Sequence, residues 1–517
     1  MATPRLPQTM ESPTETQTAK MAEEYAQWAI TRGLVKDVPE IGVTHAPLTL
    51  TPCSFPRGPF EKVWNLQTAM NRLLYASGAD GDLLHAVLDP VAASDAFVAG
   101  QLNILDAVGG VPGGASGFSV GIWRTDYLLH QVGEDDPMGI LQVENNAISV
   151  AYAALSSIVC SLHEYALTSG MLSPLPGTAL HSPPNEALKN LVFTLSSAHK
   201  LYAPEGEDAV VVIVVQEGEL NQYDQRWIQY LLFESFGIRA VRASHNTLID
   251  GLDVDQDSSV ARYGEGEGEK DVVSVFYFRA GYTPEDYPTD AHWEVRTLIE
   301  ASSSIKIPDI SAQLAGSKAV QRALTDRDIL SRYLDQDVID DALSVFAGMY
   351  ALPADDADAD AIIAKAIANP DNYVLKPQRE GGGNNLYRQE MADALASMPR
   401  AELEAYILMD RIVPPQVSAL VMRNKNVQVV DAVSELGVFG FFIYDVETQK
   451  EVYNAPGGYL LRTKPSNLDE GGVSAGVSYL DSLVLYDQGV VGVKRGGDDD
   501  PASSSSSSSK RQKPLSQ

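Results

Sequence analysis

The stretch Lys376-Pro377-Gln378-Arg379-Glu380-Gly381-Gly382-Gly383-Asn384-Asn385 decides which fold this sequence indicates. It follows a short apolar run at 373–375 that is typical of a strand. Three consecutive glycines carry the largest backbone entropy cost and have no side chain to pack, so they stabilise neither a helix nor a strand. They do let backbone N–H groups approach a ligand, while Lys376 supplies a cation for phosphate and Glu380 a carboxylate for Mg²⁺. The stretch therefore predicts a loop that grips a nucleoside triphosphate, which makes an ATP-consuming enzyme the first hypothesis.

The alternative interpretation of a bare triple glycine is a flexible hairpin tip. The flanking lysine, glutamate and two asparagines favour the phosphate loop, because they place charged and amide groups at its edges. Two commoner nucleotide motifs are absent, since the chain has no G-x-x-x-x-G-K-[ST] and no G-x-G-x-x-G after a strand. Neither a P-loop fold nor a Rossmann dinucleotide-binding fold is therefore indicated.

Length and composition limit the class of protein. A chain of 517 residues exceeds what one hydrophobic core supports, so we expect two or three domains. Its formal net charge of -31 opposes binding to nucleic acid or to an anionic membrane. No apolar run reaches the roughly 18 residues of a transmembrane helix, and the polar N-terminus is not a secretory signal. The only two cysteines, Cys53 and Cys160, lack metal spacing, which indicates a reducing cytoplasm.

Both ends of the chain are expected to be solvated. Residues 1–20 predict a disordered arm, and residues 496–517, which include seven consecutive serines, predict a disordered tail. The acidic runs 265–269, 355–360 and 498–500 are best interpreted as solubilising segments. An anionic substrate would then require local arginines and lysines, so the few basic positions at strand ends become informative.

The spacing of apolar residues predicts the elements around the glycine loop. It predicts helices at 21–33, 60–76 and 147–172, and strands at 120–123 and 140–143. From about residue 310 onward helices alternate with strands at 374–376, 406–409, 427–433 and 438–444.

The middle of the chain predicts a βαβ unit. Residues 210–215 are a continuous β-branched run, typical of a strand buried on both faces. A helix over 224–236 follows and ends at Gly237, and strands are predicted at 238–243 and 272–278. Ligands of open α/β sheets bind beyond the carboxyl ends of the strands. Residues 217–221 and 279–282 are therefore expected to face one site, although each alone is equally typical of an ordinary loop.

Polar residues with metal-binding or phosphate-binding chemistry follow several of these strands. Glu144 and Asn146 are two apart, so they share a face of an extended segment, and with Glu380 they give three oxygen ligands that suit Mg²⁺. Arg462 and Lys464 also alternate on one strand. Residues 470–476 form a second small-residue loop, or else a plain turn. No Ser/His/Asp constellation is readable and the eight histidines show no metal spacing, so a covalent hydrolase has no support.

In these motifs the chain resembles the eukaryotic glutathione synthetases, a family of ATP-grasp peptide ligases. The resemblance runs from about residue 55 to about residue 485. Its landmarks, in order, are 124–127, 142–146, 224–226, 279–282, 308–318, 376–387, 434–437 and 461–464. It implies an α/β ATP-grasp fold with an inserted parallel-sheet substrate-binding domain and a mobile lid, a cytoplasmic homodimer, and Mg²⁺ as the cofactor.

The resemblance also implies roles for single residues. The metal ligands would be Glu144, Asn146 and Glu380. The contacts to ATP would be Glu144, Lys318, Lys376, Gly381, Gly382, Gly383, Asn384, Asn385, Tyr387, Met409, Asp410, Arg411, Ile412, Glu435, Lys464 and Glu470. The site for γ-glutamylcysteine would be Arg124, Ser149, Glu219, Leu220, Asn221, Gln225, Arg279, Ala280, Gly281, Tyr282, Arg462, Val473 and Ser474. Catalysis would fall to Arg124, Lys318, Lys376 and Arg462.

The resemblance further implies a division of the chain. Residues 21–207 would form the N-terminal part of the ATP-grasp body, between the arm at 1–20 and the substrate-binding domain at 208–316. Residues 317–495 would form the lid and the C-terminal part of the body, before the tail at 496–517.

Four positions depart from the family pattern. Ala151 stands where a serine is usual, which removes one hydroxyl near the dipeptide. Asp410 replaces a common glutamate near the adenine, and Glu470 replaces an aspartate. Ser474-Ala475 stands where glutathione-forming members commonly have two alanines, in the loop that borders the acceptor amino acid.

The implied chemistry agrees with the residues present. A carboxylate is a poor acylating agent, so ATP would convert the cysteinyl carboxylate into an acyl phosphate, which the amine of glycine then attacks. The developing charge requires Mg²⁺, lysine, arginine and backbone donors rather than a protein nucleophile. Two alternatives remain: a ligase that uses another acceptor such as β-alanine, and a non-catalytic binding protein that retains the ATP-grasp shell.

Overall fold

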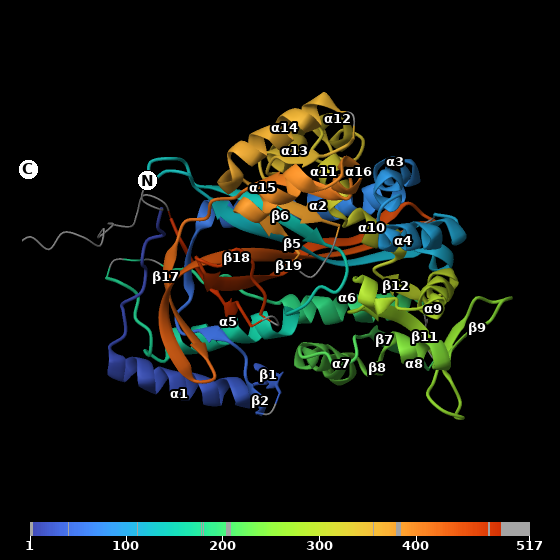
Figure 1. Cartoon of the computed structure of the whole chain (residues 1–517). Helices are drawn as coiled ribbons and strands as arrows, with labels where there is room; N and C mark the ends of the chain where they lie inside the picture. The colour runs from blue at the N-terminus through green and yellow to red at the C-terminus, as the bar shows by residue number, and fades with distance from the viewer. Residues whose placement is uncertain are drawn as a thin grey trace, which may run out of the picture.

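The computed structural model describes residues 4–39, 41–110, 112–176, 178, 180–202, 208–354, 356–378, 384–473 and 476–487. This part of the chain forms sheets of seven, six and four strands, together with two two-stranded pairings. Figure 1 shows the seven-stranded sheet in the middle of the molecule, with helices above and below it. The architecture is mixed α/β, as the sequence predicts.

The seven-stranded sheet has the order β17-β3-β20-β19-β18-β5-β6. Its strands are β17 (Val417–Arg423), β3 (Leu48–Thr49), β20 (Tyr479–Asp481), β19 (Lys450–Pro465), β18 (Asn426–Asp445), β5 (Phe118–His130) and β6 (Gly139–Asn146). Successive side chains of a strand face opposite sides of a sheet. Phe439 and Phe441 of β18 therefore join one core, and Leu436 and Val438 join the other.

Helices cover both faces of this sheet. The first face is covered by α1 (Glu15–Thr31), α5 (Ala153–Thr168) and α6 (Ala187–Tyr202), whose apolar residues share one core. The second face is covered by α2 (Arg57–Ala79), α3 (Gly81–Ala92), α4 (Ala96–Ala107), α10 (Ile310–Ala315), α11 (Lys318–Ala323), α12 (Arg327–Leu330) and α13 (Gln336–Leu343). The pairing of β21 (Leu483–Tyr486) with β4 (Cys53–Pro56) lies against this second core.

The six-stranded sheet confirms the predicted βαβ unit. β7 (Ala209–Val214) lies parallel to both β8 (Ala240–Ala243) and β11 (Asp271–Phe278), and β12 (Ile305–Ile307) lies parallel to β11. Short antiparallel strands β9 (Leu252–Val254) and β10 (Ala261–Tyr263) extend it. Its helices are α7 (Gln222–Phe236), α8 (His245–Gly251) and α9 (Asp290–Ala301), with 3₁₀ turns η1 (Gly114–Ser116) and η2 (Pro284–Asp286) beside it. Gly237 ends α7 in the left-handed conformation, with φ of 70°, as predicted.

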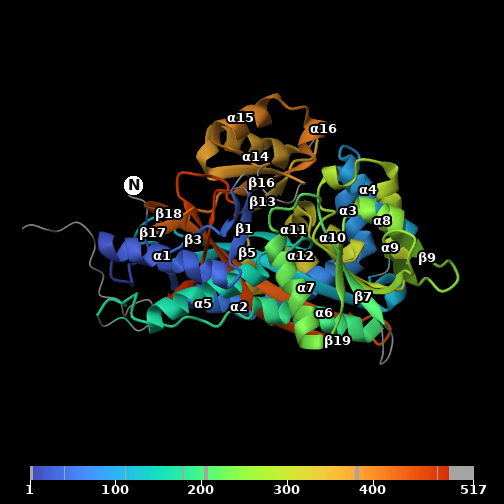
Figure 2. The ribbon, with the colours of Figure 1, turned by 90° about the horizontal axis from the view of Figure 1, so that it is seen from below.

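The four-stranded sheet forms a separate unit with its own apolar core. Its strands are β13 (Met349–Ala351), β16 (Tyr406–Asp410), β14 (Tyr373–Pro377) and β15 (Leu386–Tyr387), and its helical segments are α14 (Ala357–Ala368), η3 (Pro370–Asn372), α15 (Arg388–Ser397) and α16 (Arg400–Leu403). Figure 1 and Figure 2 both show this unit projecting from the body of the molecule. Its inner face packs against β5 and β6 through an apolar cluster, and we call this contact the seam.

Three predicted boundaries are wrong. Residues 427–433 and 438–444 belong to one continuous strand, β18, because Gly437 continues the ladder between them. The predicted helix at 147–172 begins only at Ala153, since Ser149 and Tyr152 have positive φ and form a loop. The helix expected at 21–33 begins at Glu15, where Thr14 forms a capping box with Gln17.

The N-terminal arm also differs from the expected disorder. Residues 4–14 pack along the body, with Leu6 and Met10 buried and the Leu6 N–H donating to the carbonyl oxygen of Gln416 (2.8 Å). The hairpin of β1 (Val35–Val38) and β2 (Gly42–His45) follows α1. The predicted tail at 496–517 lies outside the described residues. Within the described residues, the search for a helix with the length and apolar character needed to span a membrane finds none.

Candidate functional site

A fully buried carboxylate, Asp126, is the centre of the candidate site. The register of β5, β6, β18 and β19 brings Asp126 opposite Glu144 and Gly437, Arg124 opposite Asn146, and Glu435 opposite Arg462. Antiparallel neighbours on one face of a sheet have Cβ atoms roughly 5 Å apart. Two pairs of consecutive strands, β5 with β6 and β18 with β19, lie about 300 residues apart in the chain and together bring these polar side chains to the middle of the sheet.

Arg124 and Asp126 form a bidentate pair. The Arg124 guanidinium donates from Nε to Asp126 Oδ1 (2.6 Å) and from Nη2 to Asp126 Oδ2 (2.8 Å). Burial alone would raise the pKa of Asp126, but the Arg124 and Arg462 guanidinium groups outweigh it and hold that pKa below its usual value. Gly437 makes room for the pair, because a Cβ on it would lie 2.5 Å from Asp126 Oδ1 and 2.6 Å from Arg124 Cδ.

Arg462 and Lys464 extend the cluster along β19. Nη2 of Arg462 donates to Asp126 Oδ2 (2.9 Å) and also to a carboxylate oxygen of Glu435. Lys464 Nζ donates to the carbonyl oxygen of Asp469. Burial lowers the pKa of Lys464, and the nearby Glu435 carboxylate acts in the opposite direction. The site thus places two guanidinium groups and an ammonium group on one face of the sheet, beside carboxylates.

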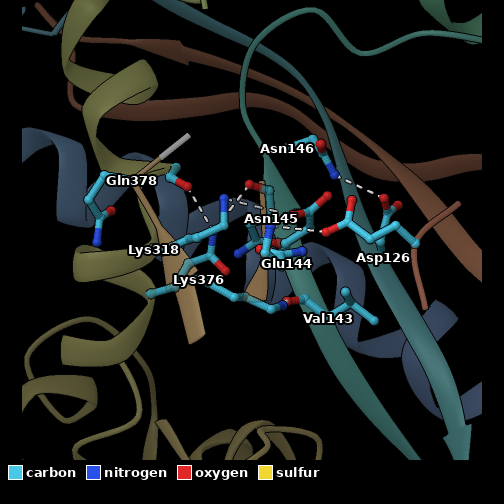
Figure 3. A network of polar contacts seen from close by, with 12 residues as sticks. Asp126, Val143, Glu144, Asn145, Asn146, Lys318, Lys376 and Gln378 are labelled. Atoms are coloured by element: carbon cyan, nitrogen blue, oxygen red, sulfur yellow. Dashed lines mark hydrogen bonds and ion pairs between the residues drawn. The ribbon is translucent and has the colours of Figure 1, made fainter. Parts of the chain in front are cut away.

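Two further lysines lie beside the end of β6 (Figure 3), one from α11 of the body and one from β14 of the four-stranded unit. Lys318, the first residue of α11, lies with its Nζ 4.0 Å from Glu144 Oε2. Lys376 of β14 is buried and donates from Nζ to the carbonyl oxygen of Val143 (3.2 Å). Burial lowers the pKa of Lys376, while the Glu144 carboxylate raises it. The two cations and Glu144 converge on the end of β6, as the sequence predicts for phosphate-binding residues.

Glu144 and Asn146 present oxygen donors at this point. The Asn146 side-chain amide donates from Nδ2 to Asp126 Oδ2 (3.0 Å) and to the carbonyl oxygen of Arg124 (3.3 Å). These two bonds fix the amide through its nitrogen, so its oxygen points to the opposite side, where it is available to a cation. Carboxylate and amide oxygens are the ligands that Mg²⁺ prefers. The third predicted ligand, Glu380, lies outside the described residues, as do Gly381, Gly382 and Gly383.

The seam between β6 and the four-stranded sheet is apolar. Val374, Met409 and Ile412 form a cluster there with Ala347, against which residues of both sheets pack: Leu128, Leu141, Val143, Met349 and Tyr387. An apolar cluster beside buried lysines has the composition that an adenine ring requires.

The side chains of Asp410 and Arg411 make contacts within the four-stranded unit. Tyr350 OH donates to Asp410 Oδ2 (3.4 Å), and Arg411 Nη1 donates to the carbonyl oxygen of Asp371 (3.2 Å). Burial raises the pKa of Asp410. The structure thus places Met409 and Ile412 in the apolar cluster. The side chains of Asp410 and Arg411 bind other residues of the four-stranded unit instead.

The end of the glycine-rich segment meets the second small-residue loop. The backbone N–H of Asn385 donates to Glu470 Oε1 (3.0 Å), and Asn385 Nδ2 donates to the hydroxyl of Tyr387 (3.4 Å). Asn384 is the first described residue after the glycines. The two loops predicted from sequence are therefore neighbours, although Ser474 of the second loop lies outside the described residues.

A second group of predicted residues gathers beyond the ends of β7 and β11. Arg279 follows β11, is buried, and lies with Nη1 3.1 Å from Asp224 Oδ2. The same Asp224 accepts from the backbone N–H groups of Tyr152 (2.9 Å) and Ala154 (3.0 Å). Ser149 Oγ donates to the carbonyl oxygen of Arg279 (3.0 Å). The loop of positive φ before α5 is thus fixed to the six-stranded sheet.

The remaining predicted residues surround this group. Asn221 N–H and Gln225 Nε2 donate to the Glu219 carboxylate (2.7 and 3.4 Å), and Gln313 Nε2 donates to the carbonyl oxygen of Gly281 (2.8 Å). Ala280 is buried, and Tyr282 OH donates to the side chain of Gln216. A small cavity brings together the predicted residues Leu220, Asn221 and Val473.

The loop before α5 joins the two groups of predicted residues. Arg124 Nη1 donates to the carbonyl oxygen of Ala151 (3.3 Å), and Ser149 of the same loop contacts Arg279. Residues in left-handed backbone conformation, such as Ser149 and Tyr152, are concentrated at functional sites. Among the described residues, this loop therefore connects the cluster around Arg124 with the group around Arg279.

The sequence analysis did not predict two residues of the site, Asp126 and Asp224. Both carboxylates are fully buried and hold arginines. A signal for Asp126 existed, because an aspartate two residues after an arginine shares its face on a strand. Asp224 carried no such signal, since its partners come from a distant loop.

Comparison with known proteins identifies the family of this chain. The family model described as "Eukaryotic glutathione synthase, ATP binding domain" matches residues 15–485. The glutathione synthetase of Dictyostelium discoideum is 35% identical over 478 residues, which are 90% of this chain and 98% of that protein. The human glutathione synthetase is 34% identical over 480 residues, which cover 90% and 97% of the two chains.

A solved structure shows the same fold. A glutathione synthetase-like effector from Globodera pallida superposes with a TM-score of 0.71 at 20% sequence identity, over 92% of this chain and 98% of that chain. The family model covers well over half of the chain, and the Dictyostelium and human proteins are matched over nearly their whole length. The chain belongs to the eukaryotic glutathione synthase family.

Proposed function

We propose that this protein joins glycine to γ-glutamylcysteine at the expense of ATP and releases glutathione, ADP and phosphate. Its enzyme class, an ATP-dependent ligase, follows from membership of the family. The observation that carries the proposal is the convergence of Lys318, Lys376 and Glu144 on the end of β6, beside the paired Arg124 and Arg462. This arrangement places groups that bind phosphate next to groups that bind a carboxylate. An acyl phosphate forms from these two reactants, a phosphoryl group and a carboxylate.

ATP would occupy the seam between β6 and the four-stranded sheet. The adenine would lie against the apolar cluster of Val374, Met409 and Ile412. The triphosphate would extend toward Lys318 and Lys376, with further contacts from the glycine segment 381–385, Tyr387, Glu435, Lys464 and Glu470. The four-stranded unit is then the lid, and residues 317–495 contain it together with the C-terminal part of the body.

The residues present suit Mg²⁺. Glu144 and Asn146 would hold it together with Glu380, because each offers an oxygen and Asn146 has its nitrogen committed to Asp126. When bound, Mg²⁺ supplies charge compensation for the phosphoryl oxygens. Lys318 and Lys376 add cations at the same point, since both Nζ atoms lie against β6.

The dipeptide would lie across the loop 149–151. Arg124 and Arg462 would face its reacting carboxylate, while Ser149, Glu219, Gln225 and the turn 279–282 would face its γ-glutamyl end. Asp126 compensates the two guanidinium groups and fixes their orientation, which leaves outward N–H donors for a substrate carboxylate. Residues 208–316 are in this sense the substrate-binding domain, built on the parallel sheet.

The chemistry that this site favours is attack of the cysteinyl carboxylate on the γ-phosphorus of ATP, followed by attack of the glycine amine on the acyl phosphate. Negative charge develops on phosphoryl and carbonyl oxygens, and the lysines and arginines are fixed where they compensate it. Acyl phosphates hydrolyse in water, so loops that close over the reactants protect the intermediate. The loops at 379–383 and 470–476 would serve this purpose.

We further propose a homodimer. Exposed apolar side chains gather where the end of α1, the β1–β2 hairpin and α7 meet: Ile30, Ile41, Val43, Tyr230 and Phe233. Trp227 Nε1 of α7 donates to the carbonyl oxygen of Gly33 (3.3 Å), which shows that these elements are adjacent. Contiguous apolar patches of this kind mark interfaces. A cytoplasmic location stays a prediction; the relatives from Solanum lycopersicum and Arabidopsis thaliana are named chloroplastic.

The deciding experiment measures ATP turnover with γ-glutamylcysteine and three acceptors, glycine, β-alanine and serine. We expect turnover to require the dipeptide and kcat/KM to favour glycine at least about tenfold over β-alanine, because one methylene in a closed pocket discriminates by about 1–3 kcal/mol. A preference for β-alanine would show that the acceptor is β-alanine, while the assignment as a ligase would still hold. Absence of turnover with every acceptor would leave only a binding role.

Glu144→Gln should abolish turnover, and Glu164→Gln on the outer face of α5 is the matched control.

A further inference from the structure

The turn that follows β11 is held by one carboxylate, that of Asp286 in the 3₁₀ turn η2. Its Oδ2 accepts from the backbone N–H groups of three consecutive residues, Gly281 (2.9 Å), Tyr282 (3.0 Å) and Thr283 (3.2 Å). Successive N–H groups that point at one spot form a concavity that binds anions. The chain therefore fills this anion-binding concavity with a side chain of its own.

The second oxygen of Asp286 reaches the segment that follows the neighbouring strand. Oδ1 accepts from Gln216 Nε2 (2.9 Å), and Gln216 Oε1 accepts from the hydroxyl of Tyr282 (3.3 Å). Gln216 lies two residues after the end of β7, which is parallel to β11. The carboxyl ends of parallel neighbours meet at one edge of a sheet, and ligands of open α/β sheets bind there. Asp286 thus joins the two segments that leave adjacent strands at this edge.

The carbonyl group of the same turn is held from the opposite side. The carbonyl oxygen of Gly281 accepts from Gln313 Nε2 (2.8 Å) and from the hydroxyl of Tyr287 (3.4 Å). Tyr287 is buried and stacks on Trp293, with ring centroids 4.1 Å apart. Gly281 has a φ of 92°, and a Cβ on it would lie 2.9 Å from the Tyr287 hydroxyl. The turn is therefore fixed in one conformation, through its N–H groups by Asp286 and through its carbonyl group by buried side chains.

This turn carries residues of the candidate site. Arg279, its first residue, is paired with Asp224, and its carbonyl oxygen accepts from Ser149 Oγ (3.0 Å). Tyr282, three residues later, is held by both its N–H and its hydroxyl group. Asp286 acts on both residues through the backbone of the turn. A displacement of the turn would consequently move the guanidinium and the tyrosine ring together.

We propose that Asp286 is a positioning residue for the γ-glutamyl end of the dipeptide, an assignment that rests on the proposed function. Because its carboxylate occupies the three N–H groups, a substrate carboxylate at this edge is directed to the guanidinium of Arg279. Its second oxygen holds Gln216, and through it Tyr282, at the same edge. Asp286 thereby sets how strongly the site distinguishes the charged γ-glutamyl group from an uncharged acyl group.

The test compares γ-glutamylcysteine with N-butanoylcysteine. This analogue keeps the amide and the reacting cysteinyl carboxylate, but it lacks the amino and carboxylate groups of the γ-glutamyl end. We expect kcat/KM of the wild type to favour γ-glutamylcysteine by at least about 100-fold, since the charged groups of the site stay unpaired with the analogue. In Asp286→Ala this preference should fall about tenfold, through a higher KM for γ-glutamylcysteine, because a misplaced turn binds the charged end less well. The values for N-butanoylcysteine and ATP should stay unchanged.

Two further variants separate positioning from a loss of stability. Asp286→Asn keeps an acceptor oxygen for the three N–H groups and should restore most of the preference. Glu285→Ala removes an exposed carboxylate from the same 3₁₀ turn and is the matched control, with an unchanged preference. A general structural defect would lower kcat/KM for both substrates equally and would overturn the assignment of Asp286.

The wild type tells this failure apart from a failure of the proposed function. A wild-type preference that persists undiminished in Asp286→Ala would overturn only the role of Asp286. A wild type that uses both substrates equally well would overturn the proposed place of the γ-glutamyl end, and the role of Asp286 with it.

Discussion

At the scale of single residues, the site depends on buried charges that compensate one another. Asp126 joins Arg124, Arg462 and Asn146, and Asp224 joins Arg279 to the loop before α5. A buried charge without a partner is costly, so each arginine is held in one orientation by its carboxylate. The guanidinium groups are thereby positioned before any substrate arrives, which lowers the entropy that binding must overcome.

Arg124→Ala and Arg462→Ala should weaken the binding of γ-glutamylcysteine much more than that of ATP. A charge-assisted pair with a carboxylate contributes roughly 1.5–3 kcal/mol, so we expect KM for the dipeptide to rise roughly 10- to 100-fold. Steady-state kinetics with each substrate varied in turn measures the two effects separately. Arg239→Ala, which removes a half-exposed surface arginine, is the control. Equal rises in KM for both substrates would place the two arginines outside the dipeptide site.

His163 should make stability depend on pH. Its Nδ1 accepts from Ser482 Oγ (2.7 Å) and its Nε2 donates to the carbonyl oxygen of Thr49 (2.8 Å). Burial lowers the pKa of His163 to about 4. Because the unfolded chain takes up this proton near pH 6.5 and the folded chain only near 4, the free energy of unfolding falls as pH falls through that window, by about 3 kcal/mol in full.

His163→Gln keeps a neutral hydrogen-bonding group and removes this titration. The difference in Tm between the wild type and the variant should therefore shrink as pH is lowered from 7 to 5, because only the wild type loses this contribution. Thermal unfolding at several pH values gives the difference directly. A difference that stays constant with pH would show that His163 does not titrate in this way.

At the scale of elements, β18 is the strand that organises the site. It pairs with β19 on one side and β5 on the other, and it contributes Glu435 to the cluster. Gly437 leaves the space into which Arg124 and Asp126 fit. A glycine in a strand weakens the strand, and here the loss is offset by the close approach of the buried ion pair.

Gly437→Ala should displace the ion pair and so affect both stability and substrate binding. The added Cβ would overlap Asp126 and Arg124, and overpacking of this kind costs about 1–3 kcal/mol. We expect a lower Tm and a KM for γ-glutamylcysteine that rises about tenfold, while KM for ATP changes less. Gly58→Ala is the matched control, since nothing lies within 4 Å of its Cβ position. Unchanged kinetics in Gly437→Ala would mean that the pair tolerates displacement.

At the scale of the whole molecule, the four-stranded unit and the six-stranded sheet lie at opposite ends of the candidate site. The loop 149–151 contacts Arg124 on one side and Arg279 on the other. In the proposed function, movement of the four-stranded unit toward β6 would bring the phosphate groups and the dipeptide together. We have proposed the exposed apolar side chains of α1, the β1–β2 hairpin and α7 as the surface that binds a second copy.

Phe233→Asp should shift a dimer toward the monomer. Phe233 is 61% exposed on α7, and a carboxylate at its position would have to be desolvated in an interface. Sedimentation velocity at several protein concentrations measures the shift. Leu298→Asp on α9, at a side chain that is 47% exposed, is the control and should leave the distribution unchanged. If Phe233→Asp and the wild type sediment alike, the interface lies elsewhere.

The sequence by itself determined the local elements and the chemistry of the reacting groups. The β-branched run at 210–215 predicted a buried parallel strand, and β7 is one, because such a run can be satisfied only between two covered faces. The alternation of Glu144 with Asn146 and of Arg462 with Lys464 placed each pair on one face of a strand, since the side-chain period of a strand is two. The family resemblance supplied the roles of these residues, which no periodicity contains.

The tertiary structure decided which of these elements become neighbours. Only the register of β5, β18 and β19 shows that Asp126 belongs to the site. This register lets two arginines 338 positions apart in the chain (124 and 462) bind the same carboxylate. The sequence predicted separate strands at 427–433 and 438–444, and only the structure showed that they are one strand in which the ion pair fills the space beside Gly437. The arm at 4–14 has a polar composition, yet it is ordered because Leu6 and Met10 find a buried surface formed by distant segments. Local composition cannot report such contacts, since the free energy that orders these residues comes from partners hundreds of residues away.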